Sequence, residues 1–438
     1  MLIFLHKKRI EIITFSILLT VLILAFTLEP VNQMLAGYKN ILISPSVLLT
    51  DYLLVGGLAA TLFNVFVTIF VNLVLLKFLK VKITGSVFAC LLTIAGFSFF
   101  GKNFFNALPM YLGVYFYTLA TKTHYKDHIP VILLSSGISP VVSFLIFGIG
   151  LPLGWGIVIG ISVGILIGFI LPGFNAYTLK FHQGYNLYNT GFSMGVISMF
   201  ITGILGSFNL IIPRGTEVDN SYHSQLLIAI MILSSIFIIL AFIDNPKVLK
   251  KYHMILKESG KLVTDFVEIG GKDATILNIG IMGLLCIVLI KVINIQISGP
   301  VMGAVLTVLG FSALGKHPLN SIPVMLGAII AIEITPYEWT IGTTLSVLFV
   351  TGLAPIAGKF GIIAGIIAGF IHLLVTPLAL DFQGGFDLYN NGFAAGFVAG
   401  IIGNKSIQEC LELGLEEGES VIQYFGAKNK LIKRNLKK

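Results

Sequence analysis

The sequence predicts an all-α, polytopic transmembrane protein with two related halves, and two observations carry this prediction. Of its 438 residues, 56% are hydrophobic and only 11% are charged, which leaves too little polar surface to cover a water-soluble body. The segment Gly96–Lys102 (GFSFFGK) also returns as Gly310–Lys316 (GFSALGK), 214 positions later. The chain therefore combines a membrane-type composition with an internal duplication.

The duplication extends well beyond this motif. Overlaid without a gap, residues 46–113 and 260–327 are identical at about 25 of 68 positions. A second block, displaced by 201 positions, matches Phe181–Phe192 to Phe382–Phe393, so each half contains a Leu-Tyr-Asn-x-Gly-Phe motif. The two halves are thus expected to share one fold.

Apolar runs predict about 14 membrane segments, because roughly 20 apolar residues span the hydrocarbon core of a bilayer. They cover 12–28, 55–79, 84–100, 105–121, 129–149, 153–171, 188–208, 224–243, 269–291, 298–314, 319–335, 339–357, 360–377 and 389–403. The expected units are an N-terminal helix with an outside loop (1–45), a first repeat (46–208), a bridging helix with a basic linker (209–259), a second repeat (260–403) and a basic tail (404–438). Whether 188–208 and 389–403 span or re-enter is left open.

Six crossings per repeat plus one bridging helix predict that the second repeat enters the membrane from the opposite side, so that the repeats have inverted topology. With both termini in the cytoplasm, all but four of the 28 Lys and Arg residues then face the cytoplasm. The exceptions are Lys39, Lys102, Arg214 and Lys291. Parallel repeats, with one crossing fewer each, would instead place the basic, amphipathic stretch 247–261 outside.

Helix interruptions occur at matching places in the two halves. Gly101 and Gly315 close short apolar segments, and Pro109 and Pro323 interrupt the helices that follow. Inverted repeats commonly build a transport path at their interface, where interrupted helices offer backbone groups to a solute. These positions are therefore expected to lie beside such a path.

Lys102 and Lys316 follow the glycines, and Asn106 and Asn320 come four residues later. That spacing places lysine and asparagine on one helical face if the turn between them is helical. All four are predicted to bind substrate, with the two lysines holding an anion. The alternative is structural: the glycines end helices and the lysines complement the helix dipoles.

Asp51 and Asp265 open the first long segment of each repeat and have two interpretations. Each can N-cap a helix, with Glu268 completing a capping box in the second copy. Alternatively, carboxylates close to hydrocarbon form an ion or proton site. The Gly-Gly pairs at 56–57 and 270–271 would let either helix break.

The Leu-Tyr-Asn motifs add four candidate substrate ligands. Asn189 and Asn390 are predicted to N-cap the last helix of each repeat, because a helix N-terminus aimed inward can bind an anion. Three residues earlier, Asn186 in the first repeat corresponds to Asp387 in the second. Any charge selectivity is expected to arise from that difference.

Catalytic and metal-binding patterns are missing from the sequence. It contains no His-Glu-x-x-His, P-loop or nucleophile-elbow motif, which disfavours an enzyme without excluding one and predicts no catalytic residues or cofactor. Cys90, Cys286 and Cys410 lack disulfide or metal-site spacing. The net charge of +8 arises between apolar segments and at the tail, which indicates a lipid bilayer rather than nucleic acid as partner. A homo-oligomer is compatible with the sequence.

Several motifs resemble those of an uncharacterised family of multi-pass bacterial membrane proteins, defined only by a domain of unknown function. The resemblance spans nearly the whole chain and implies a bacterial cell membrane, but no substrate. The stretch 182–186 is also faintly similar to a His-Gly-Tyr-Asn-Gly stretch of urea channels. It has an additional glutamine and lacks the second glycine, so no substrate is carried over. The motifs of the first resemblance are Thr50-Asp51-Tyr52 with Gly56-Gly57, Gly96–Asn103 and Tyr188–Phe192.

These patterns together predict a transporter or channel that moves a small polar or anionic solute, or an ion, through the interface between two inverted repeats. The alternative is a membrane-embedded enzyme or lipid-handling protein, in which the polar motifs would line a lateral cavity open to lipid.

Overall fold

The computed structural model of the chain describes residues 9–213, 215 and 217–403. The predicted basic tail, with Cys410, and Arg214 lie outside these residues. Within them the fold is all-helical, and an isolated bridge between Asp51 and Phe100 is the one β-type pairing. Each predicted segment contains one or more helices, which confirms the polytopic helical class.

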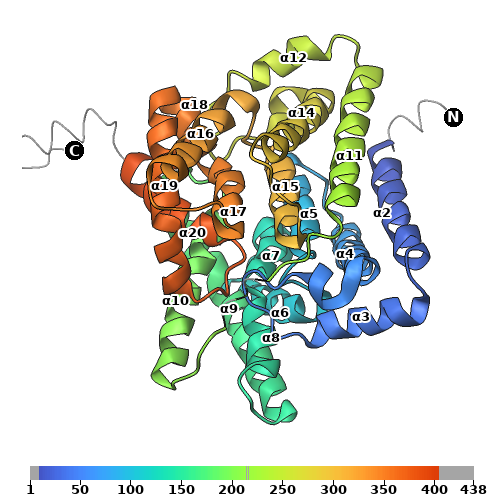
Figure 1. Ribbon diagram of the computed structural model, residues 1–438, viewed down its shortest axis with the longest axis vertical. Coiled ribbons are helices and arrows are strands. Elements are labelled where there is room, and N and C mark those ends of the chain that lie inside the picture. Colours follow the sequence, from blue (N-terminus) through green and yellow to red (C-terminus); the bar gives the residue numbers. More distant parts are fainter. Residues whose placement is uncertain (1–8, 214, 216, 404–438) are drawn as a thin grey trace, which may run out of the picture.

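The first half of the chain runs through helices that occupy the lower and right-hand parts of Figure 1. They are α2 (Arg9–Thr27), α3 (Val31–Ile43), α4 (Tyr52–Phe78), α5 (Gly85–Phe97), α6 (Phe104–Thr121), η1 (Tyr125–His128), α7 (Ile129–Ser135), η2 (Ser136–Ile138), α8 (Pro140–Phe147), α9 (Leu153–His182) and α10 (Asn189–Ser207).

The second half occupies mainly the upper part of the same view. Its helices are α11 (His223–Asp244), α12 (Val248–Ile255), α13 (Phe266–Ile269), α14 (Gly271–Val292), α15 (Gly299–Phe311), α16 (Pro318–Ile334), α17 (Ile341–Phe349), η3 (Val350–Leu353), α18 (Ala354–Phe360), α19 (Ile362–Gln383) and α20 (Asn390–Gly403).

Eight helices or helix runs of the described chain are long and apolar enough to cross a membrane, or nine when α2 and α3, bent by 109° from each other, count as one span. α5 and α15 have only 13 residues each. That length is about 20 Å, too short for roughly 30 Å of hydrocarbon. The prediction that 84–100 and 298–314 each cross on their own is therefore wrong, because the apolar runs continue past the helix ends into buried loops.

α5 and α15 pack closely against each other near the centre of the molecule, and they are antiparallel. A Cβ atom on Gly96, near the end of α5, would lie 2.5 Å from the carbonyl oxygen of Gly303, near the start of α15. A Cβ atom on Gly310, near the end of α15, would lie 2.8 Å from the carbonyl oxygen of Ala89, near the start of α5. Glycine is thus required at both crossings for the backbones to meet.

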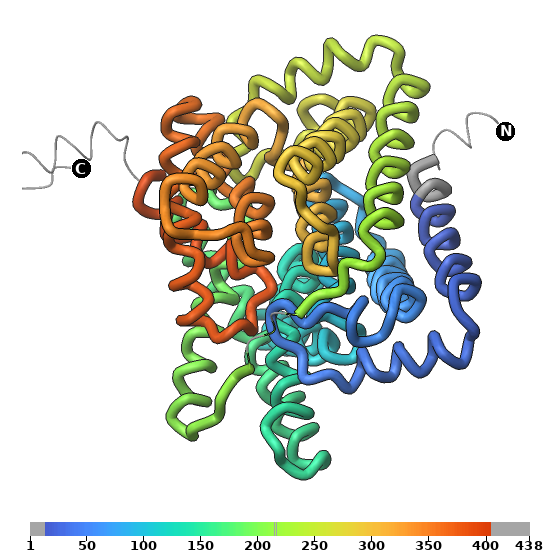
Figure 2. The backbone as a smooth tube through the Cα atoms, in the orientation of Figure 1, coloured from blue at the N-terminus to red at the C-terminus, as the bar shows by residue number. Residues whose placement is uncertain are grey.

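The outer helices of the two halves are arranged in opposite senses. α2 runs downward in Figures 1 and 2 and continues into α3, which lies across the lower part of the molecule. α11 runs upward and continues into α12, which lies across the top. α2 and α3 pack on α4, and α11 and α12 pack on α14. Part of the basic stretch 247–261, predicted to be amphipathic, forms α12, on which Lys250 is exposed and Val248 is buried.

Two segments predicted as single helices are broken in the middle. The 3₁₀ turn η2 separates α7 from α8, and η3 separates α17 from α18. Pro140 and Pro355 follow these turns and lack the amide hydrogen that a continuous helix would use. Both turns are fully or almost fully buried and face the centre of the fold.

Candidate functional site

The two Leu-Tyr-Asn motifs meet at the centre of the molecule. The rings of Tyr188 and Tyr389 lie 5.2 Å apart between centroids. Each ring also makes an edge-to-face contact with the last residue of a central helix: Tyr188 with Phe311 at 4.9 Å and Tyr389 with Phe97 at 4.6 Å. Tyr188 thus packs on α15 of the second repeat, and Tyr389 packs on α5 of the first.

Backbone hydrogen bonds also attach each Leu-Tyr-Asn motif to the opposite repeat. The amide of Leu187 donates to the carbonyl oxygen of Gly352 in η3, over 2.9 Å. The amide of Leu388 donates to the carbonyl oxygen of Gly137 in η2, also over 2.9 Å. Each motif is therefore anchored to the broken helix of the opposite repeat.

Lys316 lies beside Tyr188 and is fully buried. Its Nζ donates to Tyr188 Oη and, over 2.9 Å, to Thr351 Oγ1. The Thr351 hydroxyl donates to the carbonyl oxygen of Leu348 over 2.7 Å, so its oxygen is free to accept from the lysine. We call Lys316, Tyr188 and Thr351 the second half-site.

The corresponding side chains of the other repeat form what we call the first half-site: Lys102, Tyr389 and Ser136. The Ser136 hydroxyl donates to Leu133 O over 2.7 Å, as Thr351 does to its own helix. Lys102 has a relative exposure of 0%, yet its Nζ has no hydrogen-bond partner among the described residues. The two half-sites thus contain like side chains in unlike arrangements.

The loops that carry the lysines are held by duplicated asparagines. Asn64 Nδ2 donates to the carbonyl oxygens of Ser98 and Lys102, over 2.8 and 2.9 Å. Asn278 repeats both bonds in the second half, with distances of 2.8 and 2.7 Å. Because these amides replace the missing helical hydrogen bonds, the loops remain ordered inside the core.

Asn106 and Asn320, predicted substrate ligands, lie one turn into α6 and α16 and close the same loops. Asn106 Nδ2 donates to Gly101 O over 3.0 Å, and Asn320 Nδ2 donates to Gly315 O over 2.9 Å. The predicted shared helical face of lysine and asparagine is wrong, since α6 begins only at Phe104 and α16 at Pro318. Both asparagines complete capping boxes there instead.

Asn189 and Asn390 are the first residues of α10 and α20 rather than their N-caps. The predicted cap at Asn189 is wrong, because the side chain turns toward α9. Asn189 Nδ2 donates to Asn175 Oδ1 over 2.8 Å, and its Oδ1 accepts from Thr178 and His182 over 2.9 and 2.8 Å. Asn390 Oδ1 similarly accepts from α19, which leaves neither amide directed at the lysines.

Asn186 and Asp387 lie at corresponding positions, but their side chains make different hydrogen bonds. Asn186 Nδ2 donates across the repeats to Gly392 O over 3.0 Å. Asp387 Oδ1 accepts from the amide of Tyr389 over 2.9 Å, while Asp387 Oδ2 is buried without a partner among the described atoms. The difference between the Asn186 amide and the Asp387 carboxyl therefore lies inside the core, next to the central tyrosine.

Asp51 and Asp265 each cap two helices, one from each repeat. Asp51 Oδ1 accepts from Leu53 N in α4 over 2.9 Å, and Oδ2 accepts from Gly299 N in α15 over 3.3 Å. Burial raises the pKa of the Asp51 carboxyl to about 6, against the opposing effect of its amide donors, so it is mainly ionised at neutral pH. The N-cap interpretation is confirmed for this residue.

Asp265 repeats the arrangement. Its Oδ1 accepts from Val267 N in α13 over 2.8 Å, and Oδ2 accepts from Gly85 N in α5 over 3.0 Å. The N-cap interpretation is again confirmed. The expected capping box with Glu268 is not formed in this described segment, because the Asp265 carboxylate accepts from the amide of Val267 and not from that of Glu268.

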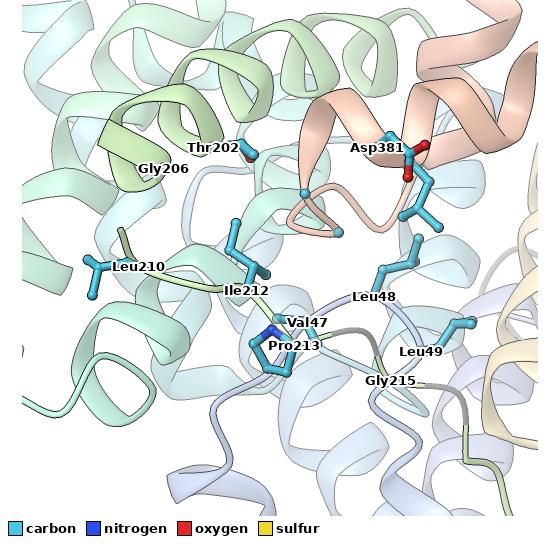
Figure 3. A pocket seen from close by; sticks show the side chains of 13 residues that line it. Val47, Leu48, Leu49, Thr202, Gly206, Leu210, Ile212, Pro213, Gly215 and Asp381 are labelled. Carbon is cyan, nitrogen blue, oxygen red and sulfur yellow. The ribbon is translucent and has the colours of Figure 1, made fainter. Parts of the chain in front are cut away.

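A crevice of about 220 Å³ lies between the two halves, as Figure 3 shows. It is bounded by the segment 47–49, the end of α10, residues 210–213 with Gly215, and the end of α19. The amide of Leu48 donates to Gly385 O there over 2.6 Å. The carboxylate of Asp381 lies at its upper edge in Figure 3. A neighbouring pocket of about 320 Å³ shares Leu49 with the crevice and is lined by Asp51.

The described residues contain no group of three His, Cys, Asp or Glu side chains placed to hold a metal ion. Cys90 and Cys286 are both buried and free. The groups present at the centre are amines, hydroxyls, aromatic rings and the carboxyl of Asp387.

Sequence reasoning did not single out Tyr188, Tyr389, Thr351 or Ser136. The tyrosines were visible as the middle residue of the duplicated Leu-Tyr-Asn motif. The hydroxyl residues immediately precede Gly-x-x-Pro stretches that recur at 137–140 and 352–355. A search for duplicated hydroxyl-bearing residues within the Leu-Tyr-Asn motifs and beside these Gly-x-x-Pro stretches would have found all four.

One family model, described as "Protein of unknown function (DUF1576)", matches residues 31–207 and 244–405, well over half of the chain. This match confirms the expected resemblance to an uncharacterised family. No curated protein and no solved structure matches the chain.

Proposed function

Because the chain belongs to DUF1576, a family of proteins of unknown function, we propose a function from its own residues: a membrane transporter for a small anionic solute. The solute binds between the two half-sites, which are brought to either side of the membrane in turn. Membrane-type helices and a duplicated polar centre support this proposal.

The proposal includes inverted topology of the repeats. The antiparallel packing of α5 and α15 supports it, as do the opposite directions of α2 and α11. The order of elements is also the same in the two halves: α2 and α3 precede α4, and α11 and α12 precede α13 and α14. On this proposal α2 and α3 correspond to α11 and α12, so each repeat is longer than the internal sequence identity indicates.

A single observation carries the proposal: Lys102 is fully buried and its amine has no partner, while Lys316 in the corresponding place has two. A charged amine buried without a partner costs several kcal/mol, and a bound anion removes that cost. In alternating access one repeat rocks against the other around the site, so the two repeats are expected to differ in any one state. The difference between Lys102 and Lys316 supplies that asymmetry.

The experiment is uptake into vesicles that contain the purified protein, with radiolabelled formate, lactate, nitrate, chloride and phosphate as the panel. We expect at least one anion to be taken up above the rate of protein-free vesicles. Lys102→Gln and Lys316→Gln should each reduce that uptake at least tenfold, because each removes the amine that holds the anion.

Lys250→Gln, on the exposed side of α12, is the matched control and should transport normally. Unchanged uptake by the double variant Lys102→Gln/Lys316→Gln would overturn the assignment of the lysines. Failure to move any anion of the panel, together with turnover of a lipid headgroup, would favour a membrane-embedded enzyme instead.

A further inference from the structure

We infer that Lys102 takes up one proton when the solute anion binds, so that a monoanion and a proton are carried together. This inference rests on the proposed function and specifies its coupling ion. It follows from how completely the side chain is enclosed and from which groups surround it.

The side chain of Lys102 is enclosed by protein, and no described group accepts a hydrogen bond from its amine. The side chain has a relative exposure of 0%, and Nζ has no hydrogen-bond partner among the described residues. The preceding Gly101 is packed so closely that a Cβ atom there would lie 2.6 Å from Leu388. Lys251 and Asp273, on α12 and α14, do form an ion pair, at 3.4 Å between Nζ and Oδ2.

The titratable groups around Lys102 do not neutralise a charge on it. Cys90 on α5 interacts directly with Lys102, Tyr111 on α6 and Tyr389 before α20 interact with Cys90, and Asp387 interacts with Tyr389, whereas α7, η2 and α8 contribute no titratable group. A thiol and phenols are uncharged at neutral pH. Asp387 is thus the one carboxyl group in this set, and it forms no ion pair with Lys102 among the described atoms.

Two combinations of charge are therefore favourable at this half-site. In one, the amine is neutral and no anion is present, which is compatible with an Nζ that has no partner. In the other, an ammonium is paired with an anion. An ammonium alone is disfavoured by several kcal/mol, and so is an anion beside a neutral amine. Binding of the anion and of the proton must then favour each other.

The second half-site supports the same reading. Lys316 is surrounded by the hydroxyls of Tyr188 and Thr351, which are neutral acceptors, and no carboxylate contacts it in the described chain. Hydroxyl acceptors satisfy a neutral amine without a counter-ion. Each half-site in its solute-free form is therefore built for an uncharged lysine.

The test is isothermal titration calorimetry of the intact, detergent-solubilised protein with sodium formate, a minimal carboxylate. Titrations at pH 8 in Bis-Tris propane and in Tris, which have different ionisation enthalpies, count the protons taken up per formate bound. We expect about one proton per formate. We also expect the affinity to fall about tenfold per pH unit wherever the empty site is neutral, because one bound proton is linked to one anion.

Formate binding with no proton uptake would overturn the inference and leave the proposed function standing. If uptake assays detect no anion transport at all, the proposed function fails, and the inference fails with it. In vesicles, formate entry should alkalinise the exterior and create no membrane potential. Charge movement with each formate would contradict coupled entry.

Two variants identify the proton-binding group. Lys102→Met should lose proton uptake, whereas the exposed control Lys250→Met should keep it. Asp387→Asn gives this position the amide side chain that the first repeat has at Asn186. Proton uptake should persist in that variant. If proton uptake were lost, Asp387 and not Lys102 would be the group that binds the proton. The wild-type proton count is decisive even if Lys102→Met does not fold.

Discussion

Tyr188 and Tyr389 pack ring against ring, 5.2 Å between centroids, yet only Tyr188 is hydrogen-bonded to a lysine among the described residues. The pair therefore marks a point at which two related halves are structurally unlike. That difference predicts unequal effects of the same substitution.

Tyr188→Phe should destabilise the protein by about 1–3 kcal/mol, because Lys316 then loses one of its two acceptors inside the core. Tyr389→Phe should cost less than about 1 kcal/mol, since no lysine depends on its hydroxyl. Thermal unfolding of the detergent-solubilised variants measures the difference. Equal losses would contradict the assignment of Tyr188 to Lys316.

His182 is held in one tautomer by its neighbours. Its Nδ1 accepts from the amides of Gly184 and Asn186 over 3.2 and 3.4 Å, so the hydrogen must be on Nε2, which donates to Asn189 Oδ1. Gln383 performs both tasks in the second repeat: Oε1 accepts from a backbone amide over 2.8 Å and Nε2 donates to an asparagine over 3.2 Å.

The second prediction is that His182→Gln keeps near-native stability, because glutamine reproduces one acceptor and one donor at the required positions. His182→Ala should cost about 1–3 kcal/mol, since it leaves buried amides without an acceptor. Melting temperatures of the two variants make the comparison. A glutamine variant as unstable as the alanine variant would show that ring packing, not hydrogen bonding, governs the site.

The third prediction concerns the crossing of α5 and α15. Gly96→Ala should destabilise by about 1–3 kcal/mol, because its Cβ would meet the carbonyl oxygen of Gly303 at 2.5 Å, and backbone cannot move aside cheaply. Gly154→Ala on α9 is the control, since nothing lies within 4 Å of a Cβ there. It should be neutral or stabilise by up to about 1 kcal/mol. Similar melting temperatures for both would contradict the close crossing.

The fourth prediction concerns the two-helix caps. Asp265→Ala removes an acceptor from both α13 and α5 and should cost about 2 kcal/mol, twice a typical N-cap. Thr84→Ala removes only the side-chain cap of α5 and should cost about 1 kcal/mol. Denaturant or thermal unfolding compares them. If Thr84→Ala proves the more damaging, the contact between the repeats contributes little.

The fifth prediction tests the proposed topology. Single cysteines placed at Asn40 on α3 and Lys250 on α12, both exposed, should be labelled by membrane-impermeant maleimide from opposite sides of sealed membrane vesicles. α3 and α12 lie across opposite parts of the molecule, so they should lie along opposite membrane faces. Labelling of both from one side would contradict inverted topology.

Much of this organisation could be predicted from sequence, and what could not has local physical causes. Duplication and hydrophobicity identified the segments, and helix-opening aspartates identified caps, because both signals are local. The end of α5 at Phe97 could not be seen, since Phe99 and Phe100 continue the apolar run although they lie in a buried loop. Which hydroxyls approach Lys316 depends on tertiary contacts, since Tyr188 is 128 residues and Thr351 is 35 residues away in the sequence.

The caps formed by Asp51 and Asp265 also bear on the origin of the fold. Each carboxylate stabilises a helix that belongs to the other copy, α15 or α5. If the repeats are inverted as proposed above, a single-copy ancestor would have satisfied those helix ends by pairing symmetrically with an identical chain inserted the other way up. Dual-topology homodimers of that kind need little charge bias. α3 carries one lysine, whereas α12 carries two and follows a third, Lys247, so fusion of the copies would have let each fix its own orientation.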